Sequence, residues 1–175
     1  IFGPVAGIMK VRSDEQARPV GDDAARESVV ELARKLRPRF QLGLLGWIRG
    51  EHVEQNLVAL ADIAGQFEAA AATQPLFQLW WVVGSVLEAL QQGGIDGSVS
   101  VKRLLGQVDR ELRRLQEHGE TRYAESPPME LLNNLLFYVA RATVAGPRVA
   151  GVRESFRLDE VLGVDEQVAE ARATL

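Results

Sequence analysis

The stretch that decides the fold is residues 101–115, Val-Lys-Arg-Leu-Leu-Gly-Gln-Val-Asp-Arg-Glu-Leu-Arg-Arg-Leu. Its apolar side chains recur at intervals of three and four, which places them on one face of an α-helix. These apolar residues are Val101, Leu104, Leu105, Val108, Leu112 and Leu115. Ser98 or Ser100 can cap the helix at its start, and Gly119 can end it. The stretch therefore predicts an amphipathic helix with one buried side.

The same spacing recurs on both sides of this stretch. It predicts helices over residues 22–50, 53–71, 76–90 and 126–139, and a shorter one over 149–156. We expect Asp22 or Asp23 to cap the first helix and Pro38 to kink or break it, because proline lacks the N–H donor. Phe77 and Trp81 widen the apolar stripe of the third helix, which indicates a central helix that contacts two neighbours.

Short connections between these helices favour antiparallel neighbours, and no alternating strand pattern is present. The fold class that we predict is all-α, an up-down antiparallel helical bundle with extra C-terminal helices. Gly93, Gly94 and Gly97 mark a helix–helix turn, and residues 120–126 are expected to form a loop. We expect residues 1–21 to be a linker or arm, 22–162 to be the bundle domain, and 163–175 to be a C-terminal helix or frayed tail.

Composition excludes several functional classes. The 175 residues include no cysteine and two histidines, so a disulfide scaffold, an iron–sulfur cluster, a cysteine nucleophile and a thiolate or histidine-rich metal centre are not expected. The formal net charge of -4 argues against a general nucleic-acid binder. No stretch reaches the roughly 18 apolar residues of a membrane span. Without cysteines or an export signal we expect a cytoplasmic protein, and the start at Ile1 suggests a piece of a longer chain.

The polar side of the helix over 98–118 is strongly basic. Its cations are Lys102, Arg103, Arg110, Arg113 and Arg114, and we expect an ion pair between Asp109 and Arg113, four residues apart. A solvated surface is the simplest interpretation of such a face. In an acidic protein, however, the same cluster can dock an acidic partner. We therefore take Lys102, Arg103, Arg110 and Arg114 as candidate partner-binding residues.

The two histidines raise the possibility of phosphoryl transfer. A phosphoryl-accepting histidine projects from the middle of a helix, followed by lysine and glycine in the pattern His-x-x-Lys-Gly. His52 is followed by Val-Glu-Gln-Asn, and His118 by Gly-Glu-Thr-Arg, so neither fits. Both are predicted near helix ends, where an exposed histidine needs no special role. We identify no catalytic, cofactor-binding or metal-binding residue.

An aromatic group stands out on the third helix. Phe77, Trp80 and Trp81 are most simply core residues, but Trp81 lies off the main seam and is a candidate anchor for a partner. A pocket near Trp80 and Trp81 is the further possibility, and it would make the domain a small-molecule sensor.

Four strings, in this order, resemble a known family. They are Leu-Ala-Arg-Lys-Leu-Arg at 32–37, the stretch 101–115 quoted above, Glu-Leu-Leu-Asn-Asn-Leu-Leu-Phe-Tyr-Val-Ala at 130–140, and residues 149–162 with Phe-Arg-Leu-Asp-Glu at 156–160. Together they are similar to the N-terminal region of the CheA-like hybrid histidine kinases of type IV pilus chemosensory systems. A related stand-alone scaffold protein of twitching motility shares this region. The resemblance covers roughly residues 30–162.

The resemblance implies a phosphotransfer-like helical domain without a usable histidine, itself not an enzyme, within a parent protein that is a histidine kinase and carries its catalytic residues elsewhere. The leading hypothesis is thus a non-catalytic docking or scaffolding domain of a chemosensory two-component signalling kinase that controls type IV pili and twitching motility. It would bind another signalling protein or another domain of its own chain. A genuine phosphotransfer domain that uses His52 or His118, and a small-molecule sensor, are the alternatives.

Overall fold

The computed structural model describes residues 28–158, and these residues contain seven helices and no strand. The helices are α2 (Val29–Ile48), α3 (Val53–Ala70), α4 (Gln74–Gln91), α5 (Val99–His118), α6 (Glu120–Glu125), α7 (Met129–Arg141) and α8 (Pro147–Ser155). The predicted all-α bundle is confirmed. The expectations for residues 1–21, for the caps Asp22 and Asp23, and for the tail from Asp159 onward lie outside the described residues.

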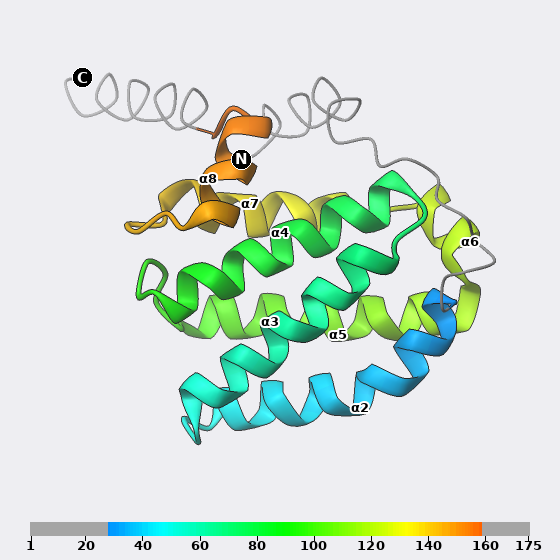
Figure 1. Cartoon of the computed structure of the whole chain (residues 1–175), viewed down its shortest axis with the longest axis horizontal. Helices are drawn as coiled ribbons and strands as arrows, with labels where there is room; N and C mark the ends of the chain where they lie inside the picture. Colours follow the sequence, from blue (N-terminus) through cyan, green and yellow to red (C-terminus); the bar gives the residue numbers. More distant parts are fainter. Residues whose placement is uncertain (1–27, 159–175) are drawn as a thin grey trace, which may run out of the picture.

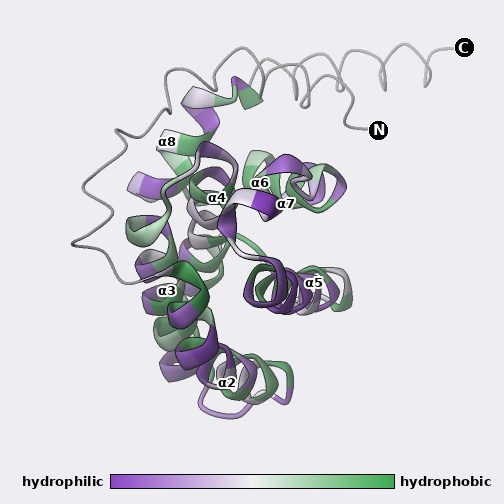
Figure 2. Ribbon diagram, turned by 90° about the vertical axis from the view of Figure 1, so that its right-hand side faces the viewer, coloured by the Kyte–Doolittle hydropathy of each residue, from purple (hydrophilic) through white to green (hydrophobic). Residues whose placement is uncertain are grey.

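Consecutive long helices run in opposite directions, as the colour gradient from α2 to α7 shows (Figure 1). Helix α4 is the central element and packs against α3, α6, α7 and α8, while α2 contacts both α3 and α5. Viewed from the side, α3 and α4 lie opposite α5 and α7, and α2 lies below both pairs (Figure 2). The prediction of a central third helix is therefore confirmed.

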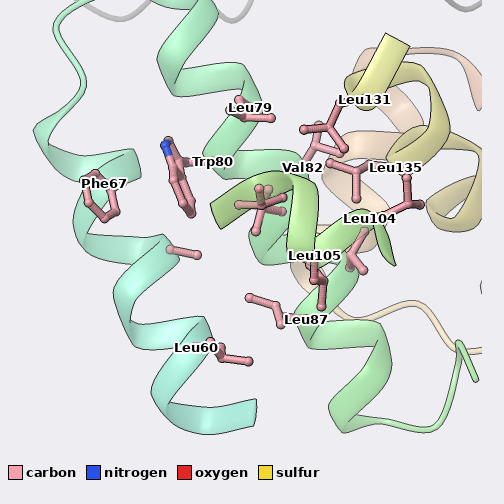
Figure 3. Packing of buried hydrophobic residues seen from close by; sticks show 14 of the residues in the cluster. Leu60, Phe67, Leu79, Trp80, Val82, Leu87, Leu104, Leu105, Leu131 and Leu135 are labelled. Atoms are coloured by element: carbon pink, nitrogen blue, oxygen red, sulfur yellow. The ribbon is translucent and has the colours of Figure 1, made fainter. Parts of the chain in front are cut away.

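The core joins all of these helices in one cluster of buried side chains. Trp80 of α4 is stacked on Phe67 of α3 with ring centroids 4.7 Å apart, and it meets Phe40 of α2 edge-on at 6.2 Å. On the other side of α4, leucines of α5 and α7 approach Leu79 and Val82 (Figure 3). Aromatic pairs in these arrangements add to the stabilisation from burial alone.

Three polar side chains form hydrogen bonds with backbone groups near the ends of other helices. The carboxylate of Glu120 accepts hydrogen bonds from the backbone N–H groups of Ala72 and Thr73, at 2.9 and 2.7 Å, and so caps α4. Glu88 accepts from the N–H groups at the start of α8, and Arg153 donates to backbone carbonyls at the end of α7. Each bond satisfies a group that the helix itself leaves unpaired.

Two predictions about α5 and its surroundings are wrong. Residues 120–126 contain the short helix α6 rather than only a loop, because Gly119 turns the chain at φ +80° and Tyr123 is buried. Such a segment carries too few apolar residues to show a helical period. Asp109 pairs with Arg37 of α2, at 3.3 Å, instead of Arg113. Arg113 pairs with Glu117, at 2.9 Å.

The predicted break at Pro38 is wrong as well, while the alternative of a kink stays a prediction. Helix α2 continues from Val29 to Ile48 with Pro38 inside it, so there is no break. Pro38 and Arg34, whose carbonyl loses its usual donor, are both exposed, so water can satisfy that oxygen.

Candidate interaction surface

Helix α5 presents its cations outward because its apolar face is completely buried. The side chain of Ser98 caps the helix by accepting a hydrogen bond from the backbone N–H of Val101, at 3.3 Å. All six apolar residues named in the sequence analysis are buried, as predicted. The hydrophilic residues of α5 are visible in purple in Figure 2.

Three of the predicted site residues lie together on this outer side. Arg103 and Arg110 are exposed and Lys102 is half-buried. None of the three forms an ion pair with another residue of the range 28–158. They are therefore available, on the described part of the chain, for an external anion. Whether they bind a partner stays a prediction.

Arg114 lies on the same helix but already has several contacts. Its guanidinium pairs with Glu111 at 2.9 Å, donates to the backbone carbonyl of Ser126, and lies 4.6 Å from the ring centroid of Tyr123. The Tyr123 hydroxyl donates to Glu111, at 3.2 Å, and burial together with the adjacent Glu111 carboxylate raises the pKa of Tyr123. These contacts attach α6 to α5, which is a structural role for Arg114.

Trp81 is separate from these cations. It is half-buried on α4, with its ring 6.1 Å from that of Phe77 and 6.2 Å from that of Phe156. A β-carbon added at Gly151 of α8 would meet the Trp81 ring at 3.4 Å. Trp81 thus packs where α4 meets α8, and a role as a partner anchor is not tested by this placement. Trp80 is 1% exposed, is stacked on Phe67 and meets Phe40 edge-on, so it is a core residue; a ligand pocket near Trp80 and Trp81 stays a prediction.

A groove follows the line between α5 and α7. One hollow of about 330 Å³ is lined by Ser100, Arg103, Leu104, Gln107, Asn134, Phe137 and Tyr138. A second, of about 380 Å³, is lined by Gln107, Arg110, Glu111, Pro128, Met129, Glu130, Leu131 and Asn134. The two hollows share Gln107 and Asn134, so they lie next to each other along the α5–α7 groove, beside Arg103 and Arg110.

The sequence analysis missed the contribution of α7 to this groove. Phe137 and Tyr138 lie off the leucine seam of α7, and that position was the signal that could have identified them as surface residues. Their rings meet edge-on at 5.2 Å, and the guanidinium of Arg141 lies 4.6 Å from the centroid of Phe137. The two hollows therefore combine cations, the carboxylates of Glu111 and Glu130, amides and partly exposed aromatic rings. Aromatic residues and arginine are enriched at protein-binding surfaces.

Both histidines lie at helix ends, as predicted. His52 is the residue before α3, in the left-handed region at φ 44°, and His118 is the last residue of α5. Both are exposed. Neither projects from the middle of a helix, so the geometry gives no support to phosphoryl acceptance.

The described residues contain neither a metal-binding cluster nor a membrane-spanning helix. Within 28–158, no three His, Asp or Glu side chains come together in a group that could hold a metal ion. None of the helices in this range is both long and apolar enough to cross a bilayer.

Comparison with known proteins agrees with the scaffold-protein part of the resemblance. Residues 25–169 match the family described as the FimL scaffold protein second domain. The chain is also 30% identical, over 124 residues, to the scaffold protein FimL of Pseudomonas aeruginosa. That alignment covers 71% of this chain and 21% of the relative, so the chain spans about a fifth of the length of that relative. No solved structure matches the chain, and the likeness of the bundle to phosphotransfer domains stays a prediction. The match over residues 25–169 takes in most of the chain, which therefore belongs to the family of the FimL scaffold protein second domain.

Proposed function

We propose that this domain is a non-catalytic docking module of a scaffold protein in the chemosensory signalling that controls type IV pili and twitching motility. The family supports a scaffold role. The observation that carries the docking surface is the set of cations Lys102, Arg103 and Arg110 on the outer side of α5, without ion pairs in the range 28–158, in a chain with net charge -4.

The docking surface extends from α5 across the groove to α7. Arg103 and Arg110 line its two hollows, and Phe137 and Tyr138 supply apolar area beside Arg103. Cations at the border of a partly apolar groove attract an acidic partner and set its orientation, while the apolar area adds affinity. The partner is another signalling protein of the same pathway or another domain of the same parent protein. The predicted contributions of Arg114 and Trp81 belong at the periphery of this surface, since both have contacts within the domain.

A charge-reversal variant tests the surface. We expect Lys102→Glu, Arg103→Glu and Arg110→Glu together to abolish binding to the cognate chemosensory protein in calorimetry with purified components. In the full-length parent protein, the same triple substitution should reduce twitching zones on agar.

The matched control reverses three exposed cations of α2, Arg34, Lys35 and Arg39. This control variant has the same change in net charge at a different place. If it reduces binding as much as the α5 variant does, the effect comes from net charge and the proposed surface is wrong.

The alternative function, phosphotransfer through His52 or His118, has less support because both side chains lie at helix ends. Incubation with an active kinase or a phosphorylated response regulator decides it. We expect no label on the domain; acid-labile label that disappears in His52→Gln or His118→Gln would establish phosphotransfer instead.

The parent protein also has an alternative. The strings shared with CheA-like kinases make a histidine kinase the second candidate for the parent chain. The sequence that follows residue 175 in the parent gene distinguishes the two, because a kinase core there would contradict the scaffold assignment.

A further inference from the structure

Gly106 lies in the middle of α5, in a position where glycine brings no benefit to the fold. A β-carbon added at Gly106 would meet nothing within 4 Å, and the residue is not in the left-handed region. Glycine inside a helix is less favourable than alanine because its unfolded chain has more conformational freedom. The described part of the chain therefore contains no reason for glycine here.

Three of the other four glycines in the long helices differ from Gly106, whereas Gly65, like Gly106, leaves room for a β-carbon but does not lie among unpaired cations. A β-carbon at Gly43 would meet Leu60 at 3.2 Å, one at Gly84 would meet Arg148 at 3.0 Å, and one at Gly46 would clash with Asn56. In each case a small residue lets a neighbouring helix or side chain approach. At Gly106, no helix or side chain from residues 28–158 approaches the glycine in this way. A helix of another protein that packs closely against α5 would occupy the space beside it.

The side chains around Gly106 indicate which charge a partner at this position would carry. On a helix surface, the nearest neighbours of a residue are three and four positions away. For Gly106 these are Lys102, Arg103, Asp109 and Arg110. Asp109 pairs with Arg37 and accepts from Gln41, whereas the three cations have no ion pair in the described range. The glycine is thus surrounded by unpaired positive charge.

We propose that an acidic α-helix of a partner protein crosses α5 at Gly106. Its backbone packs against the glycine, and its carboxylates pair with Lys102, Arg103 and Arg110. The distance between packed helices depends on the side chains at the crossing point, and glycine permits the closest approach. This inference rests on the proposed docking function and adds the chemistry and geometry of the occupant.

Two other occupants fit the observations less well. A second copy that used the same face would place the cations of two α5 helices against each other, which is repulsive. A membrane or nucleic acid attracts cations but has no helix backbone that would require a glycine, and the net charge of -4 opposes binding to either polyanion. The partly apolar hollow of about 330 Å³ beside Arg103 suits side chains of a partner helix.

The test compares Gly106→Ala with a matched control, Gly65→Ala. Gly65 is inside α3, and its added β-carbon would meet only an Arg148 nitrogen at 3.9 Å. Both variants should raise the melting temperature of the 175-residue chain, by roughly 2–4 °C, because each removes a helix-interior glycine. Binding is measured against each purified chemosensory protein of the parent organism. For the protein that binds, only Gly106→Ala should raise the dissociation constant, by about tenfold or more, because the new methyl group separates the two helices.

The outcomes separate this inference from the proposed function. If the triple charge reversal on α5 abolishes binding and Gly106→Ala binds as tightly as the wild type, the helix crossing is wrong and the docking function stands. If neither change affects binding, or no chemosensory protein binds, both are overturned.

Two more measurements address the other occupants. Sedimentation that shows a dimer of the wild type and a monomer of Gly106→Ala would identify a second copy as the occupant and overturn the inference. Vesicles of phosphatidylglycerol test a membrane surface as the occupant. If the charge reversal abolishes vesicle binding, Gly106→Ala leaves it intact and neither change affects a protein partner, the helix crossing is wrong and a membrane surface is the occupant.

Discussion

At the scale of single residues, the position of Asp109 shows how tertiary structure selects among local alternatives. Asp109 and Arg113 are four residues apart, which is the spacing of an ion pair within one helix. In the folded domain Asp109 instead pairs with Arg37 of α2, and the two side chains are only 17% and 24% exposed. A partly buried pair between helices is less screened by water than an exposed pair within a helix.

We predict that Asp109→Asn lowers the free energy of unfolding by about 1 kcal/mol, because Arg37 and Gln41 lose their charged acceptor. Chemical denaturation measures the change. In double-mutant cycles Asp109→Asn should couple with Arg37→Gln and be additive with Arg113→Gln. Arg113→Gln alone should leave the unfolding midpoint unchanged, since the Arg113–Glu117 pair is mostly exposed. Coupling to Arg113 instead would mean that the pair within α5 forms in solution.

At the scale of helices, the ends of α4, α7 and α8 depend on side chains from elsewhere in the chain. Glu120, at the start of α6, caps α4, 47 residues earlier. The hydrophobic periodicity located the long helices, because burial of one face repeats every three to four residues. It could not show which acid caps which helix, since that depends on where two distant segments meet.

We expect Glu120→Ala to destabilise the domain by about 1–2 kcal/mol, because it leaves the N–H groups of Ala72 and Thr73 without an acceptor. Hydrogen exchange should become faster at these two amides before it does in the middle of α4. Glu125→Ala, at an exposed position of the same helix, is the control and should have little effect. Equal effects of the two substitutions would argue against the cap.

At the scale of the whole molecule, two loops far apart in sequence are in close contact. The α4–α5 turn meets the segment between α7 and α8, where the N–H of Thr143 donates to the carbonyl of Gly94, at 2.9 Å. A β-carbon at Gly94 would lie 2.8 Å from the carbonyl oxygen of Val144, so only glycine allows this approach. The predicted turn is confirmed, and its contact with α7–α8 explains why the turn needs a glycine at position 94.

We predict that Gly94→Ala destabilises the fold by about 1–3 kcal/mol, because backbone atoms of Val144 cannot move as easily as a side chain. Gly65→Ala has no such clash and should be stabilising. Denaturant unfolding followed by tryptophan fluorescence compares the two. A Gly94→Ala variant as stable as the wild type would mean that the two loops are not in close contact in solution.

The sequence by itself determined the all-α class, the long helices, the buried face of α5 and the placement of both histidines at helix ends. These features follow from local rules: the period of the helix, the caps and the breakers act within a few residues. Only the tertiary structure decided that Arg103 lines a hollow with Phe137 and Tyr138, and that Arg114 and Trp81 have contacts within the domain. It also decided that no atom of residues 28–158 lies within 4 Å of a β-carbon added at Gly106. Such facts depend on which helices become adjacent, and that is the result of burying all apolar faces at once, a property of the whole chain rather than of any single segment.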